Sequence, residues 1–253
     1  MRTNRLHCIH GGVRRAHGFT LIELQVSIVI ALVLLLAVCT LFISQRKTFS
    51  AQNGLAQLQE KERLTATLLA GIIQPAGYYT SPTTSSRATA LPAVSGIYAA
   101  GQYIVGTTGT AGASDTIRVR YQTASGDGIL NCQGGSNSTG GNKYYDNLFT
   151  VQTINNTKVL TCALGAGAAA STTAANAVPL VDGLQSMTVN YGVDTVGNGS
   201  ATQYLTASNV ANWNAVRSVR IVLTFVNPNY NASVNDGQPQ TIAYTQIIRL
   251  MGV

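Results

Sequence analysis

Histidine is nearly missing from this sequence. The chain has three histidines, and His7, His10 and His17 all lie before residue 18. The rest of the chain therefore lacks the commonest general base near neutral pH and the commonest nitrogen ligand for metals. Catalysis through a carboxylate pair or a serine–lysine arrangement stays open. We nevertheless expect a structural or assembly role, with no enzyme activity, no cofactor and no bound metal, because the aspartates are dispersed and several adjoin glycine in turn-like contexts. They stand at positions 115, 127, 146, 182, 194 and 236.

Cysteine is also scarce. Of the four cysteines, Cys8 lies near the N-terminus and Cys39 inside an apolar run, so Cys132 and Cys162 are the only pair in the remaining region. We expect a disulfide between them, which would close a loop of about thirty residues and contribute roughly 3 to 4 kcal/mol. The alternative is two unpaired thiols. Two cysteines without a nearby histidine fall short of a zinc site. Residues 194–200 have a faint similarity to a calcium loop but lack its spaced carboxylates, and we interpret them as a turn.

Acidic residues are fewer than basic ones, and the formal net charge is +7. Four of the arginines, at positions 2, 5, 14 and 15, precede residue 18 without an acidic partner, and the charge falls to +3 without them. The other basic residues are scattered among acidic ones and form no phosphate-binding stripe. We expect no direct binding to nucleic acid.

Charge is almost absent from residues 19–43, where Glu23 is the only ionisable carboxylate and no basic residue occurs. As a helix this run would extend roughly 38 Å, more than the roughly 30 Å hydrocarbon core of a bilayer. A buried soluble helix is the alternative, but the run shows no polar face at helical spacing. We therefore expect a transmembrane helix. The arginines before it outnumber Arg46 and Lys47 after it, which predicts a cytoplasmic N-terminus and an exported C-terminal region, where a disulfide persists.

The start of this apolar run carries a motif. Residues 18–23 read Gly-Phe-Thr-Leu-Ile-Glu, directly after the basic segment. An ordinary secretory signal is cut after its apolar region, whereas here the recognisable site precedes it. The motif resembles the signal of type IV prepilins, whose peptidase cuts after the glycine and methylates the new N-terminal amine. The resemblance implies a leader over residues 1–18, cleavage between Gly18 and Phe19, and N-methylation of Phe19.

The remaining chain divides into a helical stem and a β-rich region. Apolar residues recur at helical spacing to about residue 73, so we expect one helix from about 19 to 73 that ends before Pro75 and Gly77. Residues 44–77 would be an amphipathic stem, and residues 78–253 a globular domain with one antiparallel sheet packed on the helix. Residues 115–123 alternate in the manner of a half-buried strand, with Arg118 and Arg120 on the polar side. Residues 80–110 and 165–177 are expected loops, the first with a short strand at 103–105. The other expected strands are 148–154, 157–164, 185–193, 217–226 and 241–251.

With these features in place, the whole chain resembles type IV pilin-like proteins, most closely minor pilins of the PilW group. Beyond the signal, the segments that carry the resemblance are residues 68–78, 180–191 and 216–223. It implies an α+β fold of ladle shape, with the long N-terminal helix packed on a C-terminal antiparallel sheet domain. Major pilins commonly have proline midway through the membrane helix, where this chain has Thr40, and their leaders are often shorter. These departures favour a minor pilin.

The resemblance also implies a function and a set of partners. Such a protein is a single-pass protein of the bacterial inner membrane with a periplasmic domain. It primes pilus assembly through its N-terminal helix and resides at or near the filament tip at the cell surface. Its partners would be other minor pilins, the major pilin, prepilin peptidase, the inner-membrane assembly platform and a tip adhesin. Glu23 would pair with the Phe19 ammonium of a neighbouring subunit, the alternative being that Glu23 only reaches the lipid headgroups.

Two other functions fit parts of the sequence. A minor pseudopilin of a type II secretion system shares the signal, the helix and the sheet. A membrane-anchored periplasmic enzyme or solute-binding domain would instead require an ordered pocket with convergent carboxylates.

Overall fold

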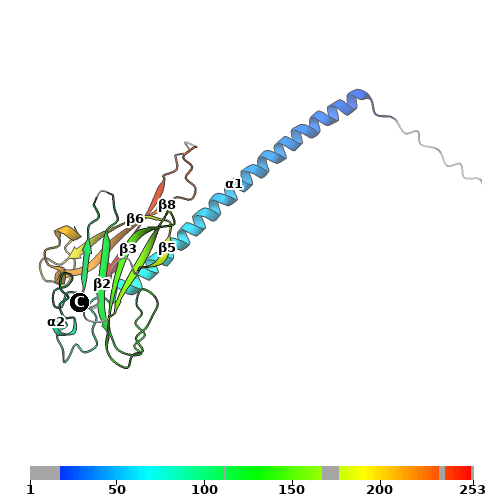
Figure 1. The fold of residues 1–253 in the computed structure, drawn as a ribbon. Helices are drawn as coiled ribbons and strands as arrows, with labels where there is room; N and C mark the ends of the chain where they lie inside the picture. The colour runs from blue at the N-terminus through cyan, green and yellow to red at the C-terminus, as the bar shows by residue number, and fades with distance from the viewer. Residues whose placement is uncertain (1–17, 111, 167–176, 234–236, 252–253) are drawn as a thin grey trace, which may run out of the picture. The chain divides into compact units, whose positions relative to one another are not determined.

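The computed structural model describes residues 18–110, 112–166, 177–233 and 237–251 (Figure 1). The expected leader up to residue 17 and most of the expected loop at 165–177 lie outside these residues. The chain forms two compact units, Met1–Ser50 and Ala51–Val253. A single helix, α1 (Leu21–Ile73), begins in the first unit and ends in the second. It ends where the sequence predicts, because Pro75 follows and Gly77 adopts a positive φ of 85°.

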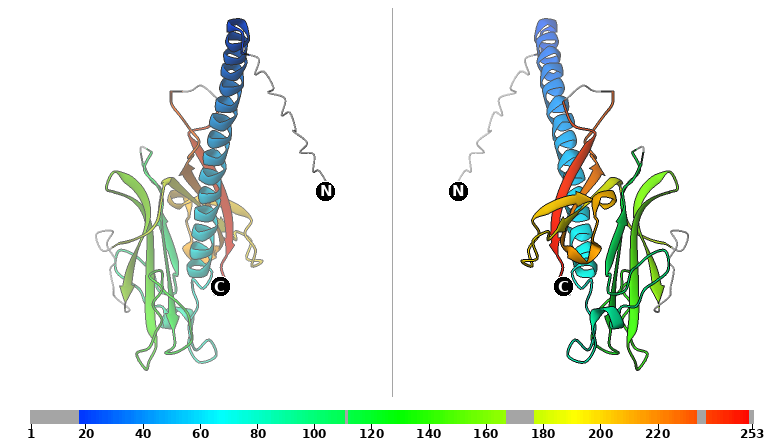
Figure 2. Two further views of the ribbon diagram at one scale, coloured as in Figure 1. Left: turned by 90° about the vertical axis from the view of Figure 1, so that its right-hand side faces the viewer. Right: turned by 90° about the vertical axis from the view of Figure 1, so that its left-hand side faces the viewer.

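The second unit contains two antiparallel sheets within the described residues, where the sequence led us to expect one (Figure 2). The five-stranded sheet has the order β1-β2-β3-β4-β5 and the four-stranded sheet the order β7-β6-β8-β9. The strands are β1 (Ile104–Thr107), β2 (Thr116–Thr123), β3 (Lys143–Ile154), β4 (Thr157–Ala166), β5 (Val178–Asp182), β6 (Leu184–Val193), β7 (Gln203–Thr206), β8 (Val216–Val226) and β9 (Thr241–Arg249). The short elements are α2 (Arg87–Ala90), η2 (Ala207–Asn209) and η3 (Trp213–Ala215).

The change from one sheet to the other occurs at Gly183. This residue separates β5 from β6 and has a φ of 80°, which glycine adopts without strain. Asn155 and Asn156 play a comparable role within the first sheet. Both have positive φ, 48° and 64°, and they form the tight turn between β3 and β4 that their residue types predict.

The hydrophobic core lies between the two sheets and the part of α1 in the second unit. Phe149, Tyr191, Phe225, Leu69 and Ile73 are all fully or almost fully buried in it. They come from β3, β6, β8 and α1, so both sheets and the helix share one core.

Polar contacts hold the helix against an edge strand of each sheet. Lys61 forms an ion pair with Asp182 of β5 at 2.8 Å, and the Gln246 side chain of β9 donates to the Ala66 carbonyl at 3.1 Å. Residues 51–73 therefore contact both β5 and β9, and Figure 2 shows the helix running beside β9.

Strand β2 corrects one expectation from the sequence. We expected a half-buried strand, but both of its faces are buried, and Arg118 and Arg120 are only 8% and 4% exposed. The segment that precedes β1 covers the polar face. Arg120 donates to the carbonyls of this segment, namely those of Leu91, Pro92, Ala99 and Gln102. We call residues 91–102 the covering segment. Because this segment is irregular, alternation of polar and apolar residues in β2 cannot predict that it covers the polar face of the strand.

Candidate functional site at the N-terminal helix

The start of α1 is a helix cap built from the motif residues. Thr20 precedes the helix, and its carbonyl accepts hydrogen bonds from the N–H groups of Glu23 and Leu24, both at 3.1 Å. The Thr20 hydroxyl also accepts from the Glu23 N–H at 3.4 Å. Thr20 and Glu23 have the spacing of a capping box, and a carboxylate in the first turn is favoured by the helix dipole. The motif thus fixes where the helix begins.

The Glu23 carboxylate is exposed, and within residues 18–50 of the described chain it has no hydrogen bond or ion pair. The hydroxyl groups of Ser27 and Thr40 in the same run are satisfied inside the helix. Ser27 donates to the Glu23 carbonyl at 2.7 Å, and Thr40 donates to the Ala37 carbonyl at 2.8 Å. Glu23 is therefore the charged side chain of this run, and it has no partner within the described residues 18–50.

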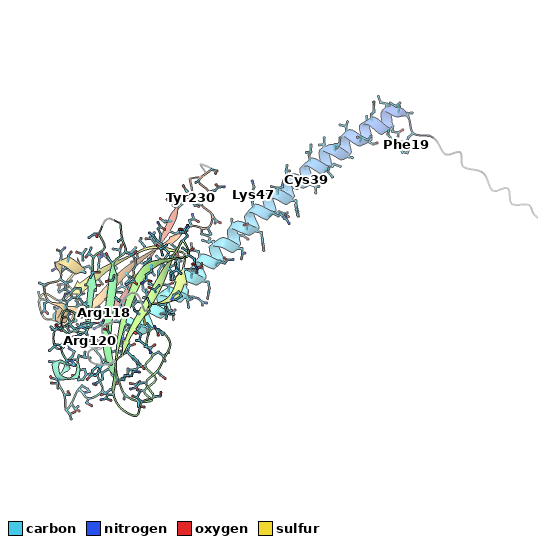
Figure 3. All side chains as sticks on the ribbon, in the orientation of Figure 1. Phe19, Cys39, Lys47, Arg118, Arg120 and Tyr230 are labelled. Carbon is cyan, nitrogen blue, oxygen red and sulfur yellow. A yellow bond between two sulfur atoms is a disulfide. The ribbon has the colours of Figure 1, made fainter. Side chains whose placement is uncertain are left out.

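The apolar run itself is uncovered within the first unit. Its large apolar side chains range from 51% exposed at Ile28 to 78% at Phe19, and Figure 3 shows Phe19 and Cys39 along this helix. By length and composition α1 is the one helix among the described residues that could cross a membrane. An apolar surface of this extent is unfavourable in water, so lipid or other helices must cover it.

Gly18 lies directly before this segment. A Cβ atom placed on Gly18 would meet nothing within 4 Å, so packing does not require glycine at this position. A requirement for glycine here would therefore come from recognition by another molecule.

Comparisons with known proteins match both ends of the chain. Residues 13–38 match the prokaryotic N-terminal methylation motif, and residues 148–249 match Type IV Pilus-assembly protein W, PilW. The chain is a type IV pilin-like protein of the PilW type. The methylation motif contains Gly18, Phe19 and Glu23, and the PilW match runs from within β3 to the end of β9.

A search of solved structures found the type IV-like pilin TTHA1219 from Thermus thermophilus. It has 16% sequence identity to this pilin-like chain and a TM-score of 0.44, and the similarity covers 76% of this chain and 96% of that one. A comparison with curated proteins gave no match.

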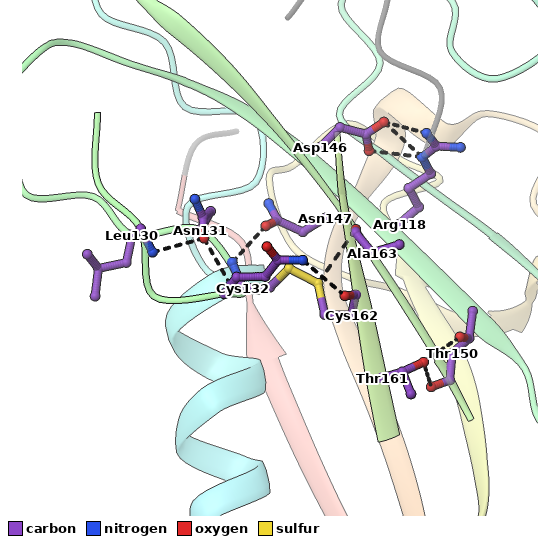
Figure 4. Close-up of a disulfide and its surroundings, with 12 residues drawn as sticks. Arg118, Leu130, Asn131, Cys132, Asp146, Asn147, Thr150, Thr161, Cys162 and Ala163 are labelled. Carbon is purple, nitrogen blue, oxygen red and sulfur yellow. Dashed lines mark hydrogen bonds and ion pairs between the residues drawn. A yellow bond between two sulfur atoms is a disulfide. The ribbon is translucent and has the colours of Figure 1, made fainter. Parts of the chain in front are cut away.

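The globular unit of this pilin-like chain contains the expected disulfide. Cys132 and Cys162 are joined, with their Cα atoms 6.3 Å apart, which excludes the alternative of two free thiols (Figure 4). Asn147 on β3 accepts the Cys132 N–H at 2.9 Å, and Tyr121 donates its hydroxyl to the Leu130 carbonyl. These contacts fasten the loop between β2 and β3 to the sheet.

The loop that begins at Asp194 is a turn stabilised by its own carboxylate. The two carboxylate oxygens accept hydrogen bonds from the four consecutive N–H groups of residues 196–199, at 2.6 to 3.2 Å. Burial raises the pKa of Asp194, but these hydrogen bonds outweigh it, and the pKa lies below its ordinary value. The oxygens thus face N–H groups, not an open cation site. No group of three potential metal ligands occurs among the described residues.

The other buried aspartates also have structural partners. Asp115 accepts the N–H groups of Gly109 and Val189, both at 2.7 Å, and Asp146 forms an ion pair with Arg118. An apolar groove of about 860 Å³ in the second unit is lined mainly by α1, β5 and the loop between β2 and β3, and no carboxylate lines it. It therefore lacks the convergent carboxylates that an enzyme or solute-binding domain would require.

Sequence reasoning missed the partners of Arg118, Arg120 and Asp146. The sequence signal for these partners would have been a strand with arginines at its polar positions, together with an aspartate on the next strand. That signal is weak, because the same residues are common on solvated strands.

Proposed function

We propose that this chain is a minor type IV pilin. Residues 19–43 hold it in the inner membrane until it joins a filament through the same helix, where it primes assembly and resides at or near the tip. One observation carries this proposal. The methylation motif leads directly into an uncovered apolar run whose one charged side chain, Glu23, has no ion pair within the described residues 18–50. The same helix would serve a minor pseudopilin of a type II secretion system, and the PilW match favours the pilus.

Processing would begin at the open segment before α1. A prepilin peptidase would cut between Gly18 and Phe19 and methylate the new amine of Phe19. This removes the arginines of residues 1–18 but keeps the apolar helix. The space around Gly18 and the 78% exposure of Phe19 support access to this bond.

Glu23 would then select the register of assembly. A carboxylate costs about 2.5 to 3.5 kcal/mol at the centre of a membrane helix and less near the interface. The methylated ammonium of Phe19 on a neighbouring subunit would offset this cost, because opposite charges attract strongly where water is excluded. Two helices joined only by apolar contacts can shift along their axes at little cost, whereas a charge pair forms at one axial position. The charge pair therefore defines how neighbouring helices align.

The remaining partners follow from this arrangement. The arginines before α1 favour a cytoplasmic N-terminus, so the unit of residues 51–253 would be periplasmic. The assembly platform of the inner membrane would extract the helix, and the neighbours would be other minor pilins, the major pilin and a tip adhesin.

The proposal is tested by replacing Glu23. Glu23→Leu should leave cleavage and membrane insertion intact, because the apolar helix only becomes more apolar. Recovery of partner pilins in pull-downs from membranes should fall about tenfold or more, which corresponds to a pair worth about 1.4 kcal/mol. Glu60→Leu is the matched control, since Glu60 is exposed on the same helix and pairs only with Arg63. Recovery of partners at the wild-type level with Glu23→Leu would refute the assembly role.

Gly18→Leu tests the processing step separately. Mass spectrometry should find the leader still attached to this variant, whereas the wild-type chain should begin at methylated Phe19. An unchanged mature mass would place the cut elsewhere.

A further inference from the structure

Two basic residues and two phenylalanines occur around the C-terminal end of the apolar run of α1. The Arg46 guanidinium lies over the Phe42 ring, 5.1 Å from its centroid. Phe42 and Phe49 are 56% and 72% exposed, and both line a shallow hollow of about 380 Å³ with Gln45 and Arg46. Positions 42, 46 and 49 have the spacing of one helix face, and Lys47 follows Arg46 in the chain and points to another side of the helix. Figure 3 shows Lys47 on α1 beyond Cys39. We call Phe42, Arg46, Lys47 and Phe49 the basic–aromatic collar.

The collar has no acidic partner on its own helix. The sequence contains no aspartate or glutamate between Glu23 and Glu60, and within residues 18–50 of the described chain neither Arg46 nor Lys47 forms an ion pair. Both basic residues are exposed, so the ligand that complements their charge is an anion.

The position of the collar fits the second surface of a bilayer. From Glu23 to Arg46 the helix rises about 35 Å, close to the roughly 30 Å hydrocarbon core plus the start of a headgroup layer. If Glu23 lies near one surface, Arg46 reaches the other. Basic side chains near exposed phenylalanine rings suit this interface, since the rings can enter the boundary between headgroups and acyl chains while the cations reach phosphates.

We infer that the basic–aromatic collar binds the phosphate groups of anionic phospholipids in the leaflet on the C-terminal side of the span. This inference rests on the proposed membrane-held stage. Arg46 would contact a phosphate through its planar guanidinium, and Lys47 through its ammonium. Phe42 and Phe49 would insert at headgroup level.

Lipid is the occupant that the surroundings favour. The collar directly continues the apolar run, whose side chains are exposed on every side, so whatever covers that run also reaches the collar. In a bilayer the molecules at this level are phospholipid headgroups. The contact would fix the depth of α1 in the membrane, and extraction into a filament would have to break it.

The test uses the full chain in asymmetric vesicles that carry phosphatidylglycerol only in the outer leaflet, where residues 51–253 lie. The fraction of spin-labelled lipid whose motion is restricted by the protein is measured for phosphatidylglycerol and for phosphatidylcholine. The ratio of the two fractions gives the preference of the protein for phosphatidylglycerol. Arg46→Gln and Lys47→Gln should each lower this preference by up to about fivefold. Arg46→Lys should retain most of it, because the charge is kept.

Arg249→Gln is the matched control, since it removes an equal charge from an exposed position on β9. The leader cannot confound the result, because its arginines face the leaflet without anionic lipid. Equal preferences for Arg46→Gln and Arg249→Gln would overturn the inference while leaving the proposed function standing. A wild-type chain that fails to enter the bilayer would overturn both.

Discussion

Asp194 shows how one carboxylate can determine the shape of a loop. Burial raises its pKa, but the hydrogen bonds from four backbone N–H groups outweigh burial, so its pKa in the folded chain lies below that in the unfolded chain. Its contribution to stability is therefore fully present above the ordinary aspartate pKa of about 3.9 and is lost as the pH falls through the lowered value.

We expect Asp194→Asn to lower the free energy of unfolding at neutral pH, because an amide offers one acceptor oxygen and places its NH₂ against N–H groups. Urea unfolding from pH 7 to pH 2 measures this. The difference from wild type should be constant above about pH 5 and shrink below about pH 4. The exposed control Glu60→Gln should show little difference at neutral pH. A difference for Asp194→Asn that grows towards low pH would contradict the lowered pKa.

The residues that could be singled out from the sequence are those that depend on their immediate neighbours in the chain. Gly18, Phe19 and Glu23 form one short string, and the turn at Asn155 and Asn156 depends only on local φ preferences. The functional roles of the first three stay predictions. The roles of Arg118 and Asp146 could not be predicted, because 28 residues separate the partners and the interaction depends on the register of β2 against β3.

At the scale of elements, β2 and β3 are joined by a buried ion pair. Arg118 donates to both oxygens of Asp146 at 2.9 Å, and Tyr98 of the covering segment donates to the same carboxylate at 3.0 Å. The two side chains are only 10% and 8% exposed. Removing one partner leaves a buried charge without compensation, whereas removing both does not.

We therefore expect Arg118→Met to lower the free energy of unfolding by about 3 to 5 kcal/mol, as for other broken buried pairs. The double variant Arg118→Met/Asp146→Leu should recover much of this loss. Urea denaturation of both variants and of Tyr98→Phe measures the coupling. A cost for Arg118→Met below about 1 kcal/mol would mean that the pair behaves like one on the surface.

Most of the strands that could be predicted were long ones with clear alternation, and the four-residue β1 was the short exception. The missed strands, β5 and β7, are short, and β5 contains Pro179, which lowers any strand signal. The division into two sheets also escaped prediction, because it depends on the backbone conformation of Gly183 and on a pairing order that alternation does not encode. Alternation indicates which face of a strand is apolar but not which strand pairs with it.

At the scale of the whole molecule, the family matches leave a long middle region of the chain uncovered, and only physical reasoning from the sequence applies there. The matches span residues 13–38 and 148–249, and the region between them contains β1, β2, the covering segment and Cys132. In this region the structure corrects the interpretation of β2 as half-buried, whereas the missed strands β5 and β7 lie within the PilW match. The compact unit also begins at Ala51 and thus includes the end of α1, whereas the sequence suggested a globular domain from residue 78.

The unit boundary predicts how fragments of the chain behave. Residues 51–253 should fold in water with a cooperative urea transition, because this fragment keeps Leu58, Leu69, Ile72 and Ile73 in the core. Residues 78–253 should not, since burial of four such side chains contributes about 1.5 to 3 kcal/mol each, comparable with the whole stability of a domain, about 5 to 15 kcal/mol. Near-ultraviolet circular dichroism and binding of a hydrophobic dye distinguish the two results. Equal transitions for both fragments would show that the sheets need no helix to cover them, and α1 would then serve the membrane and the filament alone.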